Sequence, residues 1–215
     1  MTSTDIEQIV LQLMMGISLA ACAGLRAWLP LFCVGLLARF SHVPLNENFA
    51  FLTGTPFLAI MGIATVLEVL GDKIIAVDNI LDAIGTFARP IAGALVAASL
   101  INSQDPTWAT VLSVILGGGT ALTVHSAKAR SRVQSTAAAP LHGGTVNLGM
   151  SVAEDFASIG GVALAVWIPV IAFAIALISL VVCVYLIRLA WRHGKRLLQT
   201  MSRGKQKSAE ENGTA

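Results

Sequence analysis

Charged residues are scarce in this chain of 215 residues: they make up 12% of it, whereas 55% of the residues are hydrophobic. Soluble domains usually carry about 25% charged residues. So few charges could not coat the surface of a water-soluble fold of this size, but a bundle embedded in a bilayer needs no such coat. The composition therefore argues against an ordinary soluble domain and predicts a single membrane domain.

Cysteine is also rare, and the three that occur, Cys22, Cys33 and Cys183, lie in apolar segments without metal-ligand spacing. We expect them to be small buried hydrophobic residues. The H-E-x-x-H, G-x-S-x-G and G-x-x-x-x-G-K-[ST] motifs are absent from the sequence. We therefore expect no metal site, no cofactor and no enzymatic activity.

Basic residues are missing before Arg26. Residues 19–22 (LAAC) have the small-residue pattern of a lipoprotein cleavage box, but the preceding residues include Asp5 and Glu7 and no lysine or arginine. A signal peptide needs a basic start. The N-terminus is therefore expected to be retained.

Long apolar segments predict an all-α, polytopic membrane protein with about five or six transmembrane or re-entrant helices. These segments cover about residues 8–23, 31–39, 56–71, 88–101, 107–124 and 159–191. Segment 88–101 is short, since about 1.5 Å per residue gives roughly 20 Å against a hydrocarbon core of about 30 Å. Segment 159–191 is longer than one span needs, so we expect it to be tilted, kinked at Pro169 or partly re-entrant.

The stretches between these segments are less apolar. Arg26 stands between a glycine and a proline, which indicates a broken helix or a re-entrant turn. Residues 74–87 place four apolar side chains on one helical face and are expected to lie at the membrane interface. Residues 133–149 are rich in alanine, glycine and threonine and are interpreted as a loop.

A weak internal repeat is visible when residues 60–73 are placed over residues 115–128, with identities that include a glycine, a threonine and the final lysine. Many transporters are built from such repeats and bind their substrate where the halves meet. The sequence therefore predicts a duplication, and it leaves open whether the two halves are parallel or inverted.

Seven basic residues and no acidic residue occur from Arg188 to Lys207, directly after the most apolar stretch. Basic flanks stay cytoplasmic, so residues 192–215 are predicted to be a disordered cytoplasmic tail of a multi-pass protein of the inner (plasma) membrane. The run lacks interleaved aromatic residues, so no nucleic-acid partner is expected.

The basic residues that follow segment 107–124 conflict with this orientation. A single span after residue 159 would leave Lys128, Arg130 and Arg132 on the side of the membrane opposite to the C-terminal tail. Either residues 145–167 make an extra excursion or these side chains are held inward for a purpose, and we favour the second explanation.

Four stretches carry a resemblance to a known family: AGLRAWLPLFCVGLLARF at 23–40, LEVLGDKIIAVDNILDAIGTFARPIAGAL at 67–95, HSAKARSR at 125–132 and NLGMSVAEDF at 147–156. Through them the chain resembles a bacterial integral-membrane family catalogued as domain of unknown function 4126. That family often has a proline after the Lys-Ile pair, where this chain has Ile75. The resemblance implies a membrane protein and no particular activity.

Charged residues at the edges of membrane segments are costly and therefore mark candidate functional sites. The basic set suits an anion, since arginine offers a two-pronged donor and lysine a point charge. It comprises Arg26, Lys73, Arg89, Lys128 and Arg132. By architectural analogy with lipid-phosphate translocases, this set predicts a small transporter or flippase-like carrier of a lipid phosphate or small anion. The alternative is that these side chains pair with nearby carboxylates or reach the interface, as in a non-transporting scaffold.

A second set could serve a cation or a proton pathway. It comprises Glu68, Asp72, Asp78, Asp82, His125, Glu154 and Asp155. Glu68 and Asp72 share a helical face, as do Asp78 and Asp82, and carboxylates on a shared face could bind a hard cation or relay protons. His125 could shuttle protons near neutral pH, or act as an interfacial hydrogen-bonding residue. A cation- or proton-coupled transporter is therefore the alternative function.

Overall fold

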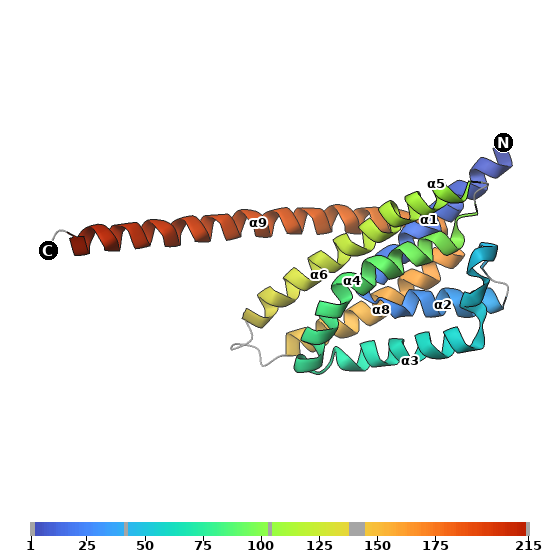
Figure 1. The fold of residues 1–215 in the computed structure, drawn as a ribbon, viewed down its shortest axis with the longest axis horizontal. Coiled ribbons are helices and arrows are strands. Elements are labelled where there is room, and N and C mark those ends of the chain that lie inside the picture. The colour runs from blue at the N-terminus through green and yellow to red at the C-terminus, as the bar shows by residue number, and fades with distance from the viewer. Residues whose placement is uncertain (1–2, 41–42, 103–104, 138–144, 214–215) are drawn as a thin grey trace.

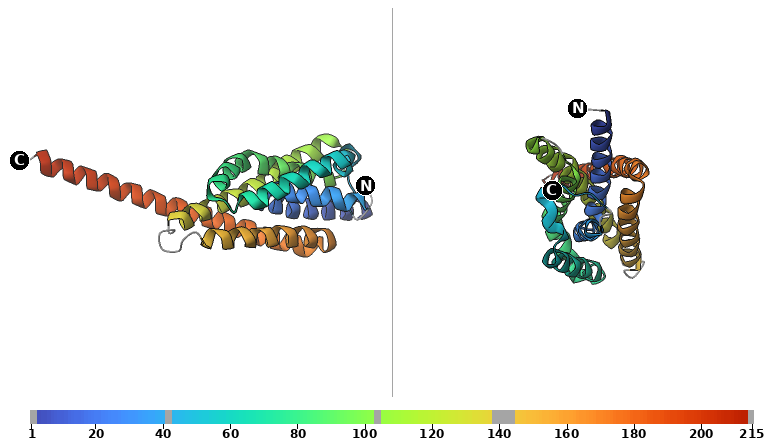
Figure 2. Two further views of the ribbon diagram at one scale, coloured as in Figure 1. Left: turned by 90° about the horizontal axis from the view of Figure 1, so that it is seen from below. Right: turned by 90° about the vertical axis from the view of Figure 1, so that its right-hand side faces the viewer.

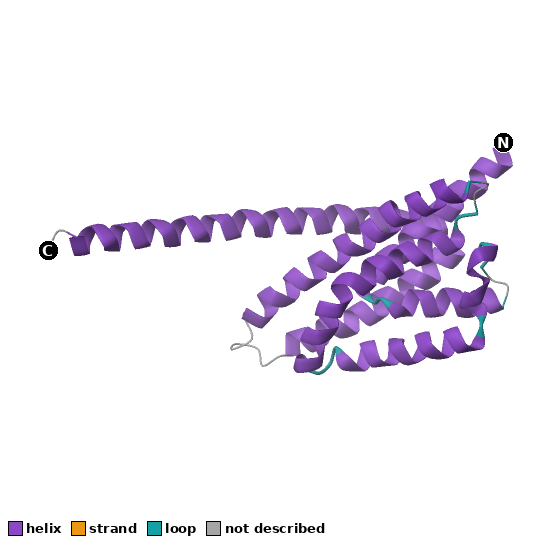
Figure 3. Ribbon diagram, in the orientation of Figure 1, coloured by secondary structure: helices purple, strands orange, loops and turns teal. Residues whose placement is uncertain are grey.

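The computed structural model describes residues 3–40, 43–102, 105–137 and 145–213, with side chains except at 3–5, 75–76, 78–79, 132–137, 145–147 and 193–213. These residues form helices and short connections, with no strand in the ranges described (Figure 3). In chain order the elements are α1 (Ser3–Leu25), α2 (Trp28–Arg39), the 3-10 helix η1 (Glu47–Thr53), α3 (Thr55–Gly71), α4 (Ile75–Leu100), α5 (Pro106–Leu112), the π-helical turn η2 (Ser113–Gly118), α6 (Gly119–Ala137), α8 (Thr145–Trp167) and α9 (Pro169–Gly213).

Five of the described helical segments are long and apolar enough to cross a membrane, and η1 with α3, bent by 64° at their junction, would make a sixth. The five are Ile6–Leu25, Ile80–Leu100, Pro106–Ser131, Leu148–Trp167 and Pro169–Arg192. The prediction of an all-α, polytopic membrane protein is confirmed. Large apolar side chains such as Ile63, Leu67 and Val181 are exposed on the bundle, where lipid would cover them.

The long helices alternate in direction along the chain, and α1 packs against α4 and α8, which run opposite to it, and against α6 and α9, which run the same way (Figures 1 and 2). At one end α3 leads into α4, α6 and α8 approach each other, and the long C-terminal part of α9 projects away (Figure 1). We call this the tail end. The N-terminus, η1 and the junction of α8 with α9 lie at the other end. α2 has 12 residues and ends at the side opposite the tail end, so it does not span the length of the bundle. Its N-terminus therefore lies inside the bundle (Figure 1).

Proline residues mark where helices begin or break. Pro56, Pro106 and Pro169 each lie in the first two positions of their helix. Backbone N–H groups at these positions make no hydrogen bond within the helix, so the N–H that proline lacks costs nothing there. Pro30 lies within the first turn of α2 for the same reason. Pro90, by contrast, lies inside α4, where it removes one hydrogen bond of the helical ladder.

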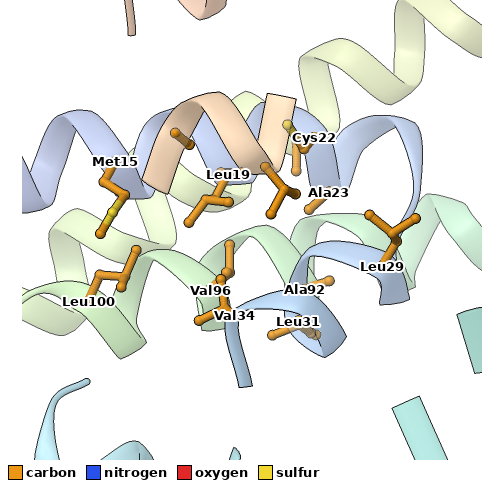
Figure 4. Packing of buried hydrophobic residues seen from close by; sticks show 14 of the residues in the cluster. Met15, Leu19, Cys22, Ala23, Leu29, Leu31, Val34, Ala92, Val96 and Leu100 are labelled. Atoms are coloured by element: carbon orange, nitrogen blue, oxygen red, sulfur yellow. The ribbon is translucent and has the colours of Figure 1, made fainter. Parts of the chain in front are cut away.

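The core is formed where α1, α2 and α4 meet, around Leu19, Val34, Val96 and Leu100 (Figure 4). Beside it, α4 comes so close to η2 and α6 that a Cβ atom on Gly93 would lie 2.5 Å from the Cβ of Ala121 and 2.7 Å from the carbonyl oxygen of Gly117. A Cβ atom on Gly117 would likewise lie 2.5 Å from the carbonyl oxygen of Gly93. Glycine is therefore required at both positions for the two helices to touch, as at other close helix contacts in membranes.

Two expectations about the middle of the chain are corrected. Residues 74–87 are not a separate interfacial helix, because residues 75–87 continue without a break into residues 88–100 as the single helix α4. Segment 88–101 is consequently not a short half-helix, since α4 has 26 residues. The predicted loop at 133–149 is shorter, because α6 extends to Ala137 and α8 begins at Thr145.

The C-terminal third also differs from expectation. Segment 159–191 breaks at Pro169, as expected, but it belongs to two antiparallel helices, α8 and α9, rather than to one long span. The predicted disordered tail continues as helix to Gly213. Residues 145–167 therefore make the extra excursion that we had disfavoured. They bring the end of α6 to the same end of the bundle as the basic part of α9, and Arg130 donates a hydrogen bond to the carbonyl of Ile187 at 3.3 Å.

Candidate functional site

Ten charged or titratable side chains from five helical elements meet in the tail-end half of the bundle. They come from the α1–α2 break, the end of α3, α4, α6 and α8. We call them the charged network: Arg26, Lys73, Arg89 and Lys128; Glu68, Asp72, Asp82, Glu154 and Asp155; and His125. Both arginine residues have no exposed surface.

Arg26 lies at the centre of the network because the break between α1 and α2 turns its side chain into the bundle. Its Nη1 forms an ion pair with Asp72 of the α3–α4 turn and also lies 3.4 Å from the carbonyl oxygen of Glu68. Its Nη2 lies 2.7 Å from Oδ1 of Asp155 and donates to the hydroxyl of Ser151 at 3.1 Å and to its carbonyl at 3.2 Å. The guanidinium of Arg26 therefore connects the break between α1 and α2 to the end of α3 and to α8.

Two lysines extend this part of the network. Lys128 of α6 lies 2.9 Å from Oε2 of Glu154 and 3.6 Å from Oδ2 of Asp72, and it donates to the carbonyl of Leu25 at 3.1 Å. Lys73 lies 3.3 Å from Oδ2 of Asp155. The Lys73 side chain is 32% exposed, whereas that of Lys128 is 2% exposed. The network thus opens toward the tail end at Lys73 and is closed at Lys128.

Glu68 caps a buried helix. Its two carboxylate oxygens accept hydrogen bonds from the backbone N–H groups of Ala27 at 3.0 Å and Trp28 at 3.3 Å, which begin α2. A carboxylate at a helix N-terminus satisfies donors that have no partner within the helix and complements the helix dipole. Oε1 of Glu68 also lies 3.5 Å from Nη2 of Arg89. This residue therefore joins the broken helix to α4.

Arg89 and His125 form the deepest part of the network. Nη1 of Arg89 lies 3.2 Å from Oδ1 of Asp82 and contacts Nδ1 of His125. An arginine offers only hydrogen-bond donors, so Nδ1 of His125 must accept the bond from Arg89. The imidazole ring in this contact is then neutral, with its proton on Nε2. That nitrogen lies 3.3 Å from the hydroxyl of Thr86. Gly85 makes room for this arrangement, because a Cβ there would lie 3.0 Å from the guanidinium carbon of Arg89.

The two parts of the network differ in formal charge. Around Arg26, three cations are matched by three carboxylates. Around Arg89, the ion pairs described join one cation to two carboxylates, Glu68 and Asp82, so there is one more carboxylate than cation in this part. Glu68 is also stabilised by the backbone N–H groups of Ala27 and Trp28. A proton taken up by His125 or by a carboxylate would make the two charges equal in number.

Some buried donors of the network lack a hydrogen-bond acceptor among the described residues. They are Nε of Arg26 and Nε and Nη2 of Arg89, although Nη2 keeps its ion pair with Glu68. Buried polar groups are satisfied in most proteins, and exceptions mark strained, catalytic or ligand-binding places. The guanidinium groups of the network therefore have hydrogen-bonding capacity left for another group.

The structure brings together all but two of the residues named from the sequence. Asp78 and Arg132 lie in helices, but their side chains fall outside the described residues. The basic set and the acidic set, treated as alternatives in the sequence, prove to be one interleaved network. Sequence reasoning missed Ser151 and Thr86, although each lies one helical turn from an acidic residue of the network, Asp155 and Asp82 respectively.

In the part of the chain that the structure describes, no three histidine, cysteine or acidic side chains are arranged to hold a metal ion. The carboxylates face arginine and lysine side chains and backbone N–H groups instead. Such an arrangement can exchange ion-pair partners, take up a proton, or release a guanidinium to an incoming anion.

The fold and the network define an all-helical, multi-pass integral membrane protein with a buried charged centre near one end. Residues 13–189 match the model of a family described as "Domain of unknown function (DUF4126)", and the chain belongs to that family. The resemblance inferred from the sequence motifs is thereby confirmed. No curated protein and no solved structure matches the chain.

Proposed function

We propose that this protein is a carrier that moves an anionic or phosphate-bearing substrate together with protons, with the charged network as its binding centre. The observation that carries the proposal is that four cations, three of them buried, contact five carboxylates in one connected set. Ionisable residues inside membrane helices cost about 2.5–3.5 kcal/mol each at the helix centre by insertion scales, and they mark substrate and proton pathways.

The pairing itself supplies a reason for proton coupling. Arg26 and Lys128 already contact carboxylates, so an anion can bind them only if those carboxylates give up their charge or move away. Protonation of Asp72 or Asp155 would free the guanidinium of Arg26 for the anion. Binding of substrate and binding of protons would then favour each other, as linkage requires.

We infer the orientation in the membrane from charge asymmetry. Lys73, Lys128, Arg130 and the basic part of α9 lie at the tail end, whereas the opposite end carries Arg39 as its basic residue among those described. Basic residues stay on the cytoplasmic side. The tail end is therefore assigned to the cytoplasm of a bacterial inner membrane, and the network opens toward that side through Lys73 and Asp155.

Transport is tested with the purified full-length protein in liposomes that contain a fluorescent pH indicator. Inorganic phosphate and succinate are added outside at pH 6, and acidification of the interior is recorded. A parallel arm follows transbilayer movement of a fluorescent phosphatidate, which separates a lipid-phosphate substrate from a small anion. We expect protein-dependent movement in one arm, accelerated by the pH gradient. No movement of any of the three probes by folded protein would refute the proposal.

Two variants connect the movement to the network. Arg26→Gln removes the central guanidinium and is expected to abolish transport. Arg39→Gln is the matched control, since Arg39 bonds only Thr55 at the exposed opposite end and should leave transport unchanged. Equal activity of the two variants would mean that the network does not bind the substrate.

The scaffold alternative retains one specific observation in its favour. Glu68 satisfies the N-terminus of α2, a structural duty that needs no substrate. If Glu68→Gln and Arg26→Gln both lower stability while no probe moves across the membrane, the network serves to hold the broken helix. The internal duplication between residues 60–73 and 115–128 remains a prediction.

A further inference from the structure

α2, η1 and α3 form a hairpin, and contacts at three levels hold it together as one body. α3 lies at the edge of the bundle and packs mainly against α2 (Figure 1). At the tail end Glu68 of α3 caps the N-terminus of α2. In the middle, a Cβ on Gly62 of α3 would lie 3.2 Å from the ring of Phe32 of α2. At the opposite end Arg39 donates to the hydroxyl of Thr55 at 3.1 Å. We call these elements the hairpin.

Both connections of the hairpin to the rest of the chain lie at the tail end, beside the charged network. They are the break at Arg26 between α1 and α2 and the turn Asp72–Ile74 between α3 and α4. The end of α1 is packed closely on α6, since a Cβ on Gly24 would lie 2.6 Å from the Cβ of Val124. The loop end of the hairpin, around η1, lies at the opposite end (Figure 1). A rotation about the two connections would therefore move η1 most.

An apolar contact closes the network off from the opposite end. Val34 of the hairpin packs in one cluster with Leu19 of α1 and Val96 of α4 (Figure 4). Between helices in a bilayer the hydrophobic effect does not favour such contacts, because lipid chains are equally apolar. Polar contacts therefore decide how firmly the hairpin is held.

Asn46 fastens the loop end of the hairpin to the end of α4. Its backbone N–H donates to the carbonyl of Ser99 at 2.8 Å, and its Nδ2 donates to the carbonyl of Ile101 at 3.0 Å. Its Oδ1 accepts from the N–H of Asn48 and caps η1. The last carbonyl groups of a helix have no partner within it, and water can satisfy them instead. The predicted span of α4 ends at Leu100, so water can replace Asn46 there once the hairpin moves.

At the tail end, two carboxylates of the hairpin contact cations of the bundle. Oε1 of Glu68 lies 3.5 Å from Nη2 of Arg89, and Oδ2 of Asp72, at the end of α3, lies 3.6 Å from Nζ of Lys128. Each of the two cations also pairs with a carboxylate of the bundle, which it would keep if the hairpin moved. An incoming anion would occupy the place that Glu68 and Asp72 occupy now. Binding of an anion therefore competes with the contacts that hold the hairpin.

From this geometry we propose that the hairpin is the gate of the carrier. An anion at Arg89 and Lys128 replaces the two hairpin carboxylates. The hairpin then swings about its tail-end connections, releases Asn46 from α4 and opens the network to the opposite side of the membrane. This inference rests on the carrier function proposed above. It adds which element moves, what holds that element shut, and why an anion opens it.

The transport test fixes the hairpin reversibly in cysteine-free protein. Asn46→Cys with Asn102→Cys lets a short bifunctional methanethiosulfonate link the hairpin to the end of α4. Arg39→Cys with Thr55→Cys is the matched control, because the same reagent then links α2 to α3 within the hairpin. Movement of inorganic phosphate, succinate and fluorescent phosphatidate is measured before linking, after linking and after reduction. The first link should slow movement by at least about tenfold until it is reduced, and the second should change it by less than about twofold.

A second measurement follows the hairpin without transport. Spin labels at Ala50→Cys of η1 and Thr107→Cys of α5 report the distance across the opposite end, and labels at Ala50→Cys and Arg39→Cys report a distance within the hairpin. α3 has 17 residues and is roughly 26 Å long, so a rotation of about 15° would move η1 by roughly 7 Å. In liposomes we expect a second, correspondingly longer distance for the first pair and a single distance for the second pair.

Asn46→Asp separates the fastening of the hairpin from the fold of its loop. Aspartate keeps the oxygen that caps η1 but cannot donate to the carbonyl of Ile101, and its charge is repelled by the carbonyl groups at the end of α4. One lost hydrogen bond corresponds to about fivefold, so the population at the longer distance should rise at least about fivefold relative to the shorter one. Asn48→Asp adds the same charge at an exposed position of η1 and should leave the ratio unchanged.

The outcomes distinguish the gate from the carrier function. Equal movement of the probes before and after residues 46 and 102 are linked would mean that the hairpin is not the gate, while the carrier function stands. If no probe moves but Asn46→Asp enlarges the longer-distance population, the hairpin is mobile and the carrier function fails. A single distance in every sample, including Asn46→Asp, would mean that Asn46 only caps α4 and would overturn the gate.

Discussion

Replacement of Arg26 by glutamine probes the charged network most directly, because its guanidinium contacts both the end of α3 and α8. The change leaves the carboxylates of Asp72 and Asp155 in a buried place without their arginine. Removing one member of a buried ion pair costs about 3–5 kcal/mol when the remaining charge is left uncompensated. Here Lys128 stays 3.6 Å from Asp72 and Lys73 stays 3.3 Å from Asp155. Arg26→Gln should therefore lower the free energy of unfolding by about 3 kcal/mol, the lower end of that range.

The partner substitution should cost less. After Asp72→Asn, Arg26 keeps Asp155, and Lys128 keeps Glu154. The loss is then one charged hydrogen bond, about 1–3 kcal/mol. In the double variant, Arg26→Gln with Asp72→Asn, residue 72 is neutral and therefore no longer a carboxylate that has lost its arginine. The free-energy cost of the double variant should therefore be smaller than the sum of the two single costs by roughly 1–3 kcal/mol.

The cycle is measured by equilibrium unfolding of the full-length protein in mixed micelles with increasing fractions of a denaturing detergent, followed by circular dichroism. Arg39→Gln provides the baseline, because its single exposed bond to Thr55 should be worth less than about 0.5 kcal/mol. Additive costs, within about 0.5 kcal/mol, would show that Arg26 and Asp72 do not interact and would refute the geometry of the network.

Three shorter predictions follow. In the His125→Gln variant, the glutamine side chain can still accept a hydrogen bond from Arg89, but it cannot bind a proton as histidine can. The variant should therefore fold normally and show proton-coupled flux slower by about tenfold or more in the liposome assay. Gly93→Ala should destabilise the protein by about 1–3 kcal/mol in the micelle assay, because its Cβ would clash with η2 and α6, whereas Gly119→Ala meets nothing within 4 Å and should not. In a cysteine-free background, Asn48→Cys should react with a membrane-impermeant maleimide from outside, and Ser208→Cys only after the membrane is opened.

The members of the network could be found from the sequence because each ionisable residue interrupts or ends an apolar segment. Arg26, Asp72 and Lys128 stood out on that ground alone. Pairing with carboxylates was one of the alternatives from the sequence, but the partner of each side chain could not be found. Arg26 meets Asp155, for example, because α1 and α8 are neighbours, which no local pattern encodes. The interpretation of the basic residues as a separate anion pocket failed to include these partners.

The same partners explain the errors in segment boundaries. The first half of α8 carries Ser151, Glu154 and Asp155, and the first half of α4 carries Asp82. Hydropathy marks such stretches as loop or interface, since the side chains that satisfy their charges come from other helices. The reversal of chain direction between Trp167 and Pro169 could not be predicted, because the residues on both sides of it are apolar. A proline within an apolar run is equally compatible with a single kinked span.

The energetics of the network argue that it serves more than cohesion. Apolar side chains of similar volume hold helices together at least as well as buried ion pairs, and replacing such pairs is often neutral or stabilising. This bundle nevertheless retains nine formal charges in its tail-end half, and among the described residues Nε of both arginines has no acceptor. Cohesion between helices does not need either feature. Both therefore favour the proposed carrier, whose centre takes up a proton and releases a guanidinium to an anion, over a scaffold.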